Sequence, residues 1–196
     1  LYFVTGNHEY MNAIWQDGNR YTDITVDDGT IWTYLNQGMD DCVIGNSARN
    51  YYYVDNVAQK MRYIILNDFG DGPVYTFEQA QVTWLESVLD SMPSGYTAVI
   101  FVHAISSVDH ETGEFTGNYC LGDIEPIIDG YSGNGEIACI IGGHTHYDGM
   151  GATTGGVPIF ITTCDKALPY ANDDTWLSSQ REIGTITEQA FDVFIV

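Results

Sequence analysis

The strongest constraint on the fold comes from two apolar runs, "TAVIFVH" over residues 97–103 and "EIACIIGG" over residues 136–143. Continuous apolar runs of this length, bounded by turn-forming or polar residues, are typical of buried strands. The runs "LYFVT" (1–5), "VPIFITT" (157–163) and "FDVFIV" (191–196) predict further strands, and "YYYVDNV" with "MRYIILN" predicts a hairpin. The chain should therefore contain a sheet with several buried strands.

Two segments carry helical patterns between these strands. A helix is predicted to start at Thr76, where Thr76 and Gln79 fit a capping box, and to stop before Pro93. A shorter helix is predicted over residues 123–128. Helices that alternate with buried strands predict a layered α/β domain. The apolar face of the first helix would consist of Val82, Leu85, Val88, Leu89 and Met92.

A single domain should span residues 1–196, because a chain of this length with 44% hydrophobic residues can form one sizeable core. Residues 11–50 are rich in Gly, Asp, Asn, Tyr and Thr and have weak periodicity, which predicts an irregular insertion or lid-like region. The chain opens and closes on predicted strands, so we expect it to be truncated at its N-terminus and also at its C-terminus. The sequence does not decide the compartment or the oligomeric state.

The charge balance restricts the possible partners. Lys and Arg number 6 and Asp and Glu number 27, which gives a formal net charge of −21. Nucleic acid and anionic lipid are not expected to bind, because a polyphosphate backbone needs clustered cations. No apolar run approaches the roughly 20 residues of a membrane-spanning helix, so no membrane segment is expected. The four cysteines form no Cys-x-x-Cys pair, which argues against a thiolate zinc site, and Cys139 is expected to be a small buried apolar residue.

Three predicted strands are followed directly by possible metal ligands. "FVTGNHE" places Asn7 and His8 after the first strand, "IFVH" ends another at His103, and "IIGGHTH" places His144 and His146 after a third. The carboxyl ends of strands in an open α/β sheet gather ligands, so these side chains could converge. Imidazole nitrogen and amide oxygen without thiolate suit Mn, Fe or Zn. A lone histidine of this kind is more often structural, but the three motifs together favour a metal site.

The same residues resemble the motifs of the calcineurin-like metallophosphoesterases. "GNHE" matches the family's Gly-Asn-His-Glu/Asp motif, "FVH" its isolated metal-binding histidine, and "GGHTH" its Gly-His-x-His motif, in matching order and at similarly wide separations. The resemblance covers essentially the whole chain. It implies an α/β fold of two packed β-sheets flanked by helices, a four-layer α-β-β-α sandwich that here would be incomplete at the N-terminus.

The resemblance also implies roles for individual residues. Asn7, His103 and His144 would ligate one metal ion, and His146 would ligate a second. His8 would be the catalytic residue beside the substrate phosphate, where it could stabilise the phosphoryl charge or protonate the leaving oxygen. The cofactors would be two divalent or trivalent ions, Mn, Fe or Zn. The substrate would be a small phosphomonoester or phosphodiester, attacked by a hydroxide that the two ions activate.

The sequence departs from the family pattern in one respect. The family's Asp-x-His and Gly-Asp-x-x-Asp motifs, which supply the remaining ligands and the bridging carboxylate, do not occur before Gly6. We therefore expect the 196 residues alone to lack phosphoesterase activity, and we expect activity to return with an upstream segment. The fifth histidine, His110, belongs to none of the three motifs and should lie away from the metal site.

Two other interpretations compete with this one. "HTHYDG" over residues 144–149 is similar to the His-x-His-x-Asp-His motif of metallo-β-lactamase-like enzymes, but Gly149 stands where the last histidine is required. That interpretation also leaves Asn7 and His8 unexplained. The second alternative is a catalytically inactive binding or scaffold domain that retains the metallophosphoesterase fold. A complete parent sequence that lacked both upstream motifs would favour this second alternative.

Overall fold

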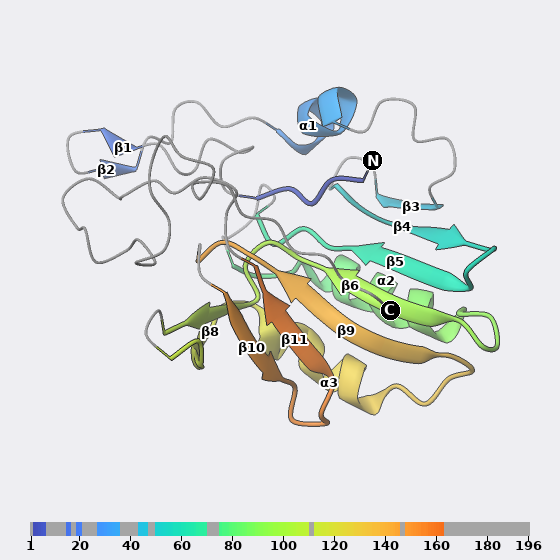
Figure 1. The fold of residues 1–196 in the computed structure, drawn as a ribbon. Coiled ribbons are helices and arrows are strands. Elements are labelled where there is room, and N and C mark those ends of the chain that lie inside the picture. Colours follow the sequence, from blue (N-terminus) through green and yellow to red (C-terminus); the bar gives the residue numbers. More distant parts are fainter. Residues whose placement is uncertain are drawn as a thin grey trace, which may run out of the picture.

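A seven-stranded mixed sheet with the strand order β10-β11-β9-β6-β5-β4-β3 dominates the fold (Figure 1). Its strands are β3 Val43–Asn46, β4 Tyr51–Asn56, β5 Met61–Ile65, β6 Thr97–Phe101, β9 Glu136–Gly142, β10 Gly149–Ala152 and β11 Pro158–Ile161. The computed structural model describes residues 2–6, 15–16, 19–20, 27–35, 43–46, 50–69, 75–109, 112–145 and 148–162. Within them the chain forms an α/β fold.

The four central strands of the sheet run parallel to one another. β5 pairs with β6, β6 with β9, and β9 with β11, whereas β3, β4 and β10 pair antiparallel with their neighbours. Parallel neighbours need crossover connections: α2 Gln79–Asp90 lies between β5 and β6, α3 Leu121–Gly130 lies between β6 and β9, and β10 lies between β9 and β11. The central strands therefore all end at the same edge of the sheet.

One face of the sheet forms the main core with α2 and α3, which lie together on the far side of the sheet in Figure 1. Successive side chains of a strand point to opposite faces, so Ala98 and Ile100 of β6 join this core together with Ile140 of β9. On the helices, the predicted apolar residues Leu85, Val88, Leu89 and Met92 are buried, and Val82 packs against them at the edge. The predicted apolar face of this helix is therefore confirmed.

The opposite face of the sheet carries the alternate side chains. Val99, Cys139 and Ile141 form a buried cluster there, which confirms that Cys139 is a buried apolar residue. Near β4 and β5 this face is covered by Val4 of the opening segment and by Trp32 of α1 (Asp28–Leu35). Among the described residues no second large sheet packs on this face. These residues also form two two-stranded sheets. One pairs β1 Trp15–Gln16 with β2 Asn19–Arg20, and the other pairs β7 Ser106–Val108 with β8 Phe115–Asn118.

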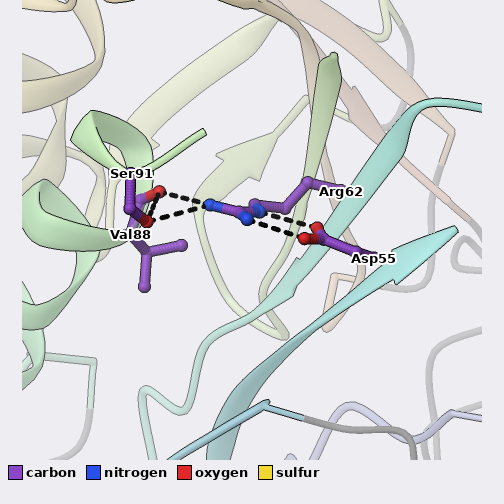
Figure 2. A network of polar contacts seen from close by, with 4 residues as sticks. All are labelled: Asp55, Arg62, Val88 and Ser91. Carbon is purple, nitrogen blue, oxygen red and sulfur yellow. Dashed lines mark hydrogen bonds and ion pairs between the residues drawn. The ribbon is translucent and has the colours of Figure 1, made fainter. Parts of the chain in front are cut away.

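A buried arginine joins the β4–β5 hairpin to the end of α2 (Figure 2). Arg62 is 3% exposed, and its Nε and Nη2 atoms each donate to one carboxylate oxygen of Asp55 at 2.7 Å. Its Nη1 donates to the carbonyl of Val88 at 2.7 Å and to the hydroxyl of Ser91 at 3.1 Å. The guanidinium also lies 4.2 Å from the ring centre of Tyr53. The buried guanidinium thus finds its partners on two neighbouring elements, β4 and the end of α2.

Two sequence predictions about element ends are wrong. The opening segment is not a strand in residues 2–6, because the Tyr52 hydroxyl donates to the Phe3 carbonyl and accepts from its N–H, in place of a strand partner. The first long helix begins at Gln79 and not at Thr76. Glu78 has an extended backbone and occupies the N-cap position without a side-chain cap hydrogen bond, so the predicted capping box does not form.

Other predictions differ from the structure in extent. The hairpin and the strands 97–103, 136–143 and 157–163 are present, and the short helix predicted over 123–128 extends over α3. Residues 11–50 include α1 and β3, so part of this predicted irregular region is regular, and its lid-like role stays a prediction. The predicted strand 191–196 lies outside the described residues. None of the described helices is long and apolar enough to cross a bilayer.

Candidate functional site

The strand register places polar residues together at the carboxyl edge of the parallel sheet. Phe101 of β6 pairs with Ile65 of β5 on one side and with Ile141 of β9 on the other. The residues that follow these three positions therefore leave the sheet side by side. They include Asp68 after β5, His103 after β6 and His144 after β9.

His103 and His144, which are 41 residues apart in the chain, meet at this edge. The Nε2 atom of His103 lies 3.1 Å from the Nδ1 atom of His144, and both side chains are half-buried. The two turns are also joined by their backbones, because the N–H of Gly143 donates to the carbonyl of His103 at 2.8 Å. The sequence prediction that these two strand ends converge is confirmed.

Three aromatic side chains surround the histidine pair. Phe69, which is fully buried, makes an edge contact with the His103 ring at 5.5 Å between centroids and a tilted contact with the His144 ring at 5.8 Å. Tyr75 and Tyr119 stack on each other at 4.7 Å and each meets His144 edge-on. The Tyr75 hydroxyl lies 3.1 Å from the Nε2 atom of His144. These contacts restrict the orientation of both imidazole rings.

The Gly-Asn-His motif reaches the same place through Gly6. A Cβ atom on Gly6 would lie 2.6 Å from the Cγ and Nδ1 atoms of His103, so the backbone at Gly6 lies directly against this ring. Thr5 is buried and its hydroxyl donates to the Asn67 side chain at 3.2 Å, next to the end of β5. Asn67 in turn exchanges hydrogen bonds of 2.8 Å with Gln81 of α2. The chain is thereby anchored beside His103 immediately before Asn7.

The structure thus brings together part of the predicted site. His103, His144 and the residue that precedes Asn7 lie at one edge of the sheet. Asn7, His8 and His146 lie outside the described residues, as does His110, so their predicted positions stay predictions.

Sequence reasoning missed Asp68, which lies behind the histidine pair. Its side chain is fully buried, and its Oδ2 atom accepts a hydrogen bond of 2.9 Å from the N–H of Ala104. Its Oδ1 atom is buried without a hydrogen-bond partner among the described residues. Burial raises the pKa of Asp68 to about 7, although backbone donors at Ala104, Asp68 and His103 act to lower it. A signal was present in the sequence, because Asp68 follows the apolar run "YIIL" as the histidines follow theirs.

The donor atoms of the histidine pair fit a shared metal ion. Two nitrogens bound to one ion at about 2.0–2.1 Å would lie about 3.0–3.4 Å apart, and the observed separation of Nε2 of His103 and Nδ1 of His144 is 3.1 Å. The Tyr75 hydroxyl at the remote nitrogen of His144 corresponds to the outer partner that metal-binding histidines usually have. The described residues contain no group of three or more His, Cys, Asp or Glu side chains that could hold an ion. The described part of the site therefore offers two nitrogen ligands.

Comparison of the sequence with protein-family models gives no match, and comparison with curated proteins gives no match either. The motifs and the geometry of the strand ends are therefore what indicates a function for this protein.

Proposed function

We propose that the protein is a metal-dependent phosphoesterase that hydrolyses a phosphomonoester or a phosphodiester. The observation that carries the proposal is the 3.1 Å separation of the Nε2 atom of His103 and the Nδ1 atom of His144 at the carboxyl edge of parallel strands. The contact of Gly6 with the His103 ring supports it, because the first motif then begins beside the other two. The resemblance of these motifs to calcineurin-like metallophosphoesterases supplies the reaction class.

The proposed ligands follow from the donor atoms. His103 would bind an ion through Nε2 and His144 through Nδ1, with the side-chain oxygen of Asn7 as a third ligand and His146 as a ligand to a second ion. The proposed fold is the two-sheet sandwich of this family, in which a second sheet would cover the face that carries Val99 and Phe101.

The chemistry requires a source of positive charge near the substrate. Bound ions would supply charge to the phosphoryl oxygens and lower the pKa of water. The chain has only 6 Lys and Arg residues, so it has few side chains that could neutralise a phosphate by themselves. His8 would hold a proton close to the leaving oxygen and donate it there.

Substitution of the proposed ligands tests this function. His144→Ala and Asn7→Ala should each lower Mn²⁺ affinity and hydrolysis of p-nitrophenyl phosphate or its bis-ester together. His8→Ala should leave metal content nearly intact and lower turnover by about 10²–10⁴-fold. His110→Ala is the matched histidine control and should change neither quantity.

Both quantities are measured by metal analysis and by a phosphatase assay with Mn, Fe and Zn. The assay is run on the 196-residue chain and, where the gene encodes an upstream segment, also on the extended form, which should then be the more active. Loss of metal in the His8 variant would show that His8 is a ligand. Metal binding without hydrolysis in either form would favour the alternative, an inactive binding or scaffold domain of the same fold.

A further inference from the structure

One hydrogen bond near the proposed metal ligands joins two residues with unusual backbones. Tyr75 has φ 60° and His144 has φ 71°, a region that residues other than glycine rarely occupy. Among the described residues other than glycine, Asn50 and Lys60 also have a positive φ. The Tyr75 hydroxyl and the Nε2 atom of His144 lie 3.1 Å apart. Backbone strain of this kind persists where the surrounding contacts hold it, and it is concentrated at functional sites.

Several contacts fix the position of the Tyr75 hydroxyl. The N–H of Tyr75 donates to the carbonyl of Asp68 at 3.0 Å, which anchors its backbone to the end of β5. Its ring packs edge-on against Phe69 at 5.0 Å and stacks on Tyr119 at 4.7 Å with an interplanar angle of 24°. With the backbone and both ring neighbours fixed, the hydroxyl has little freedom to leave the Nε2 atom of His144.

We propose that Tyr75 is a positioning residue for His144. Its hydroxyl oxygen accepts a hydrogen bond from the N–H group at Nε2 and thereby holds His144 in the tautomer whose Nδ1 lone pair points toward Nε2 of His103. The inference depends on the proposed function, since that lone pair is the one offered to a metal ion. It assigns a task to a residue that no sequence motif marks.

The tautomer matters because a neutral imidazole has one donor nitrogen and one acceptor nitrogen. If Tyr75 accepts from Nε2, then Nδ1 is bare and accepts a hydrogen bond from Nε2 of His103 across the 3.1 Å contact. Binding of an ion to both nitrogens would release that His103 proton to Nδ1 of the same ring or to solvent. If Tyr75 instead donates to Nε2, then Nδ1 carries the proton and cannot bind an ion. The two arrangements have the same distances between heavy atoms and opposite consequences for metal binding.

The test measures the tautomer directly in the metal-free 196-residue chain. Histidine is labelled with ¹⁵N, and NMR spectra that correlate ring protons with ring nitrogens are recorded at about pH 8, above the ordinary histidine pKa. The signal that is lost in His144→Gln is assigned to His144. We expect His144 to be protonated at Nε2. Tyr75→Phe keeps the ring contacts and removes the hydroxyl, so it should give a mixture of tautomers and lower Co²⁺ affinity by about 10–100-fold.

Tyr119→Phe is the matched control, because Tyr119 meets His144 through its ring. This variant should keep the wild-type tautomer and Co²⁺ affinity. A wild-type His144 protonated at Nδ1, or a tautomer unchanged in Tyr75→Phe, would overturn the inference even if the protein bound Co²⁺. Failure of the wild-type chain to bind any ion would count against the proposed function instead, and the tautomer spectra alone would then decide the role of Tyr75.

Discussion

The ring of His103 lies against the backbone of Gly6, in the space that a side chain at position 6 would occupy. A Cβ atom there would approach three ring atoms of His103 to 2.6–2.7 Å, well inside van der Waals contact. The ring can rotate away, so the backbone need not move, but the ring then leaves its place beside His144. The glycine of the Gly-Asn-His motif is therefore required by the histidine of a neighbouring motif.

Gly6→Ala should accordingly lower metal affinity more than it lowers stability. We expect Co²⁺ affinity to fall by about tenfold or more and the free energy of unfolding to fall by about 1 kcal/mol. Gly143→Ala is the control, since its Cβ would meet no atom closer than 3.9 Å. Titration calorimetry and urea unfolding measure the two quantities. Equal affinity in the two variants would show that the His103 ring does not need its present position.

Asp68 is the residue whose ionisation should affect folding most directly. Its pKa is about 7 in the folded chain, against an ordinary value of 3.8. The folded chain thus keeps a proton that the unfolded chain loses, so the contribution of Asp68 to stability is full below about pH 4 and is lost as pH rises to about 7. Above that range the folded chain contains a buried charge.

Asp68→Asn should remove this pH dependence, because the amide can still accept from Ala104 and does not titrate. The unfolding free energy of the variant minus that of the wild type should increase between about pH 4 and pH 7, by at most about 1.4 kcal/mol per pH unit. Urea unfolding in EDTA measures it without bound metal. Glu136→Gln removes one exposed carboxylate and controls for net charge. A difference that stays constant with pH would contradict the assignment of a buried, protonated carboxyl.

At the scale of elements, Arg62 connects the β4–β5 hairpin with the last turn of α2. The guanidinium bonds Asp55 through two parallel contacts and the end of α2 through two more (Figure 2). These directional hydrogen bonds help to orient the helix on the sheet, because the apolar contacts of α2 have no fixed direction.

Arg62→Met should lower the free energy of unfolding by about 3 kcal/mol, because it leaves Asp55 without its partner and leaves the Val88 carbonyl with the Ser91 hydroxyl as its side-chain donor. Arg62→Lys should recover part of this loss, since a point charge cannot reproduce the paired contacts with Asp55. Lys60→Met, at an exposed position of the same hairpin, should change stability by no more than about 0.5 kcal/mol. Chemical denaturation compares the three variants. A loss below about 1 kcal/mol in Arg62→Met would mean that the network contributes little net stability.

At the scale of the whole molecule, the formal net charge of −21 acts against compactness. Like charges at the surface repel one another, and salt screens this repulsion over a Debye length of about 10 Å at 0.1 M. Raising NaCl from about 0.02 M to about 0.3 M should therefore raise the midpoint of thermal unfolding in EDTA by a few degrees. Choline chloride should have the same effect, which would separate screening from specific binding of Na⁺. A midpoint that falls with salt would contradict dominant self-repulsion.

The sequence by itself determined the features that depend on short-range patterns. Apolar runs such as 97–101 and 136–142 specify strands because a strand buried on both faces needs apolar residues on both. The apolar stripe of α2 specifies which face of that helix is buried. The α/β class follows, and a meeting of His103 with His144 could be expected because parallel strands end at one edge, although the structure supplied the pairing of β6 with β9. The motifs also named the candidate ligands, although they could not place Asn7, His8 or His146.

Only the tertiary structure decided the features that depend on contacts between distant segments. α2 begins three residues after Thr76, behind an extended Glu78, in a segment where the N–H of Phe77 donates to Asp123, far along the chain. The opening segment is held by the hydroxyl of Tyr52 and not by a strand, which no local pattern could reveal. The burial of Asp68 and the hydrogen bond between the Tyr75 hydroxyl and Nε2 of His144 likewise arise from packing at the sheet edge. Local propensity selects the elements, but burial and long-range hydrogen bonds decide where they end and what their side chains face.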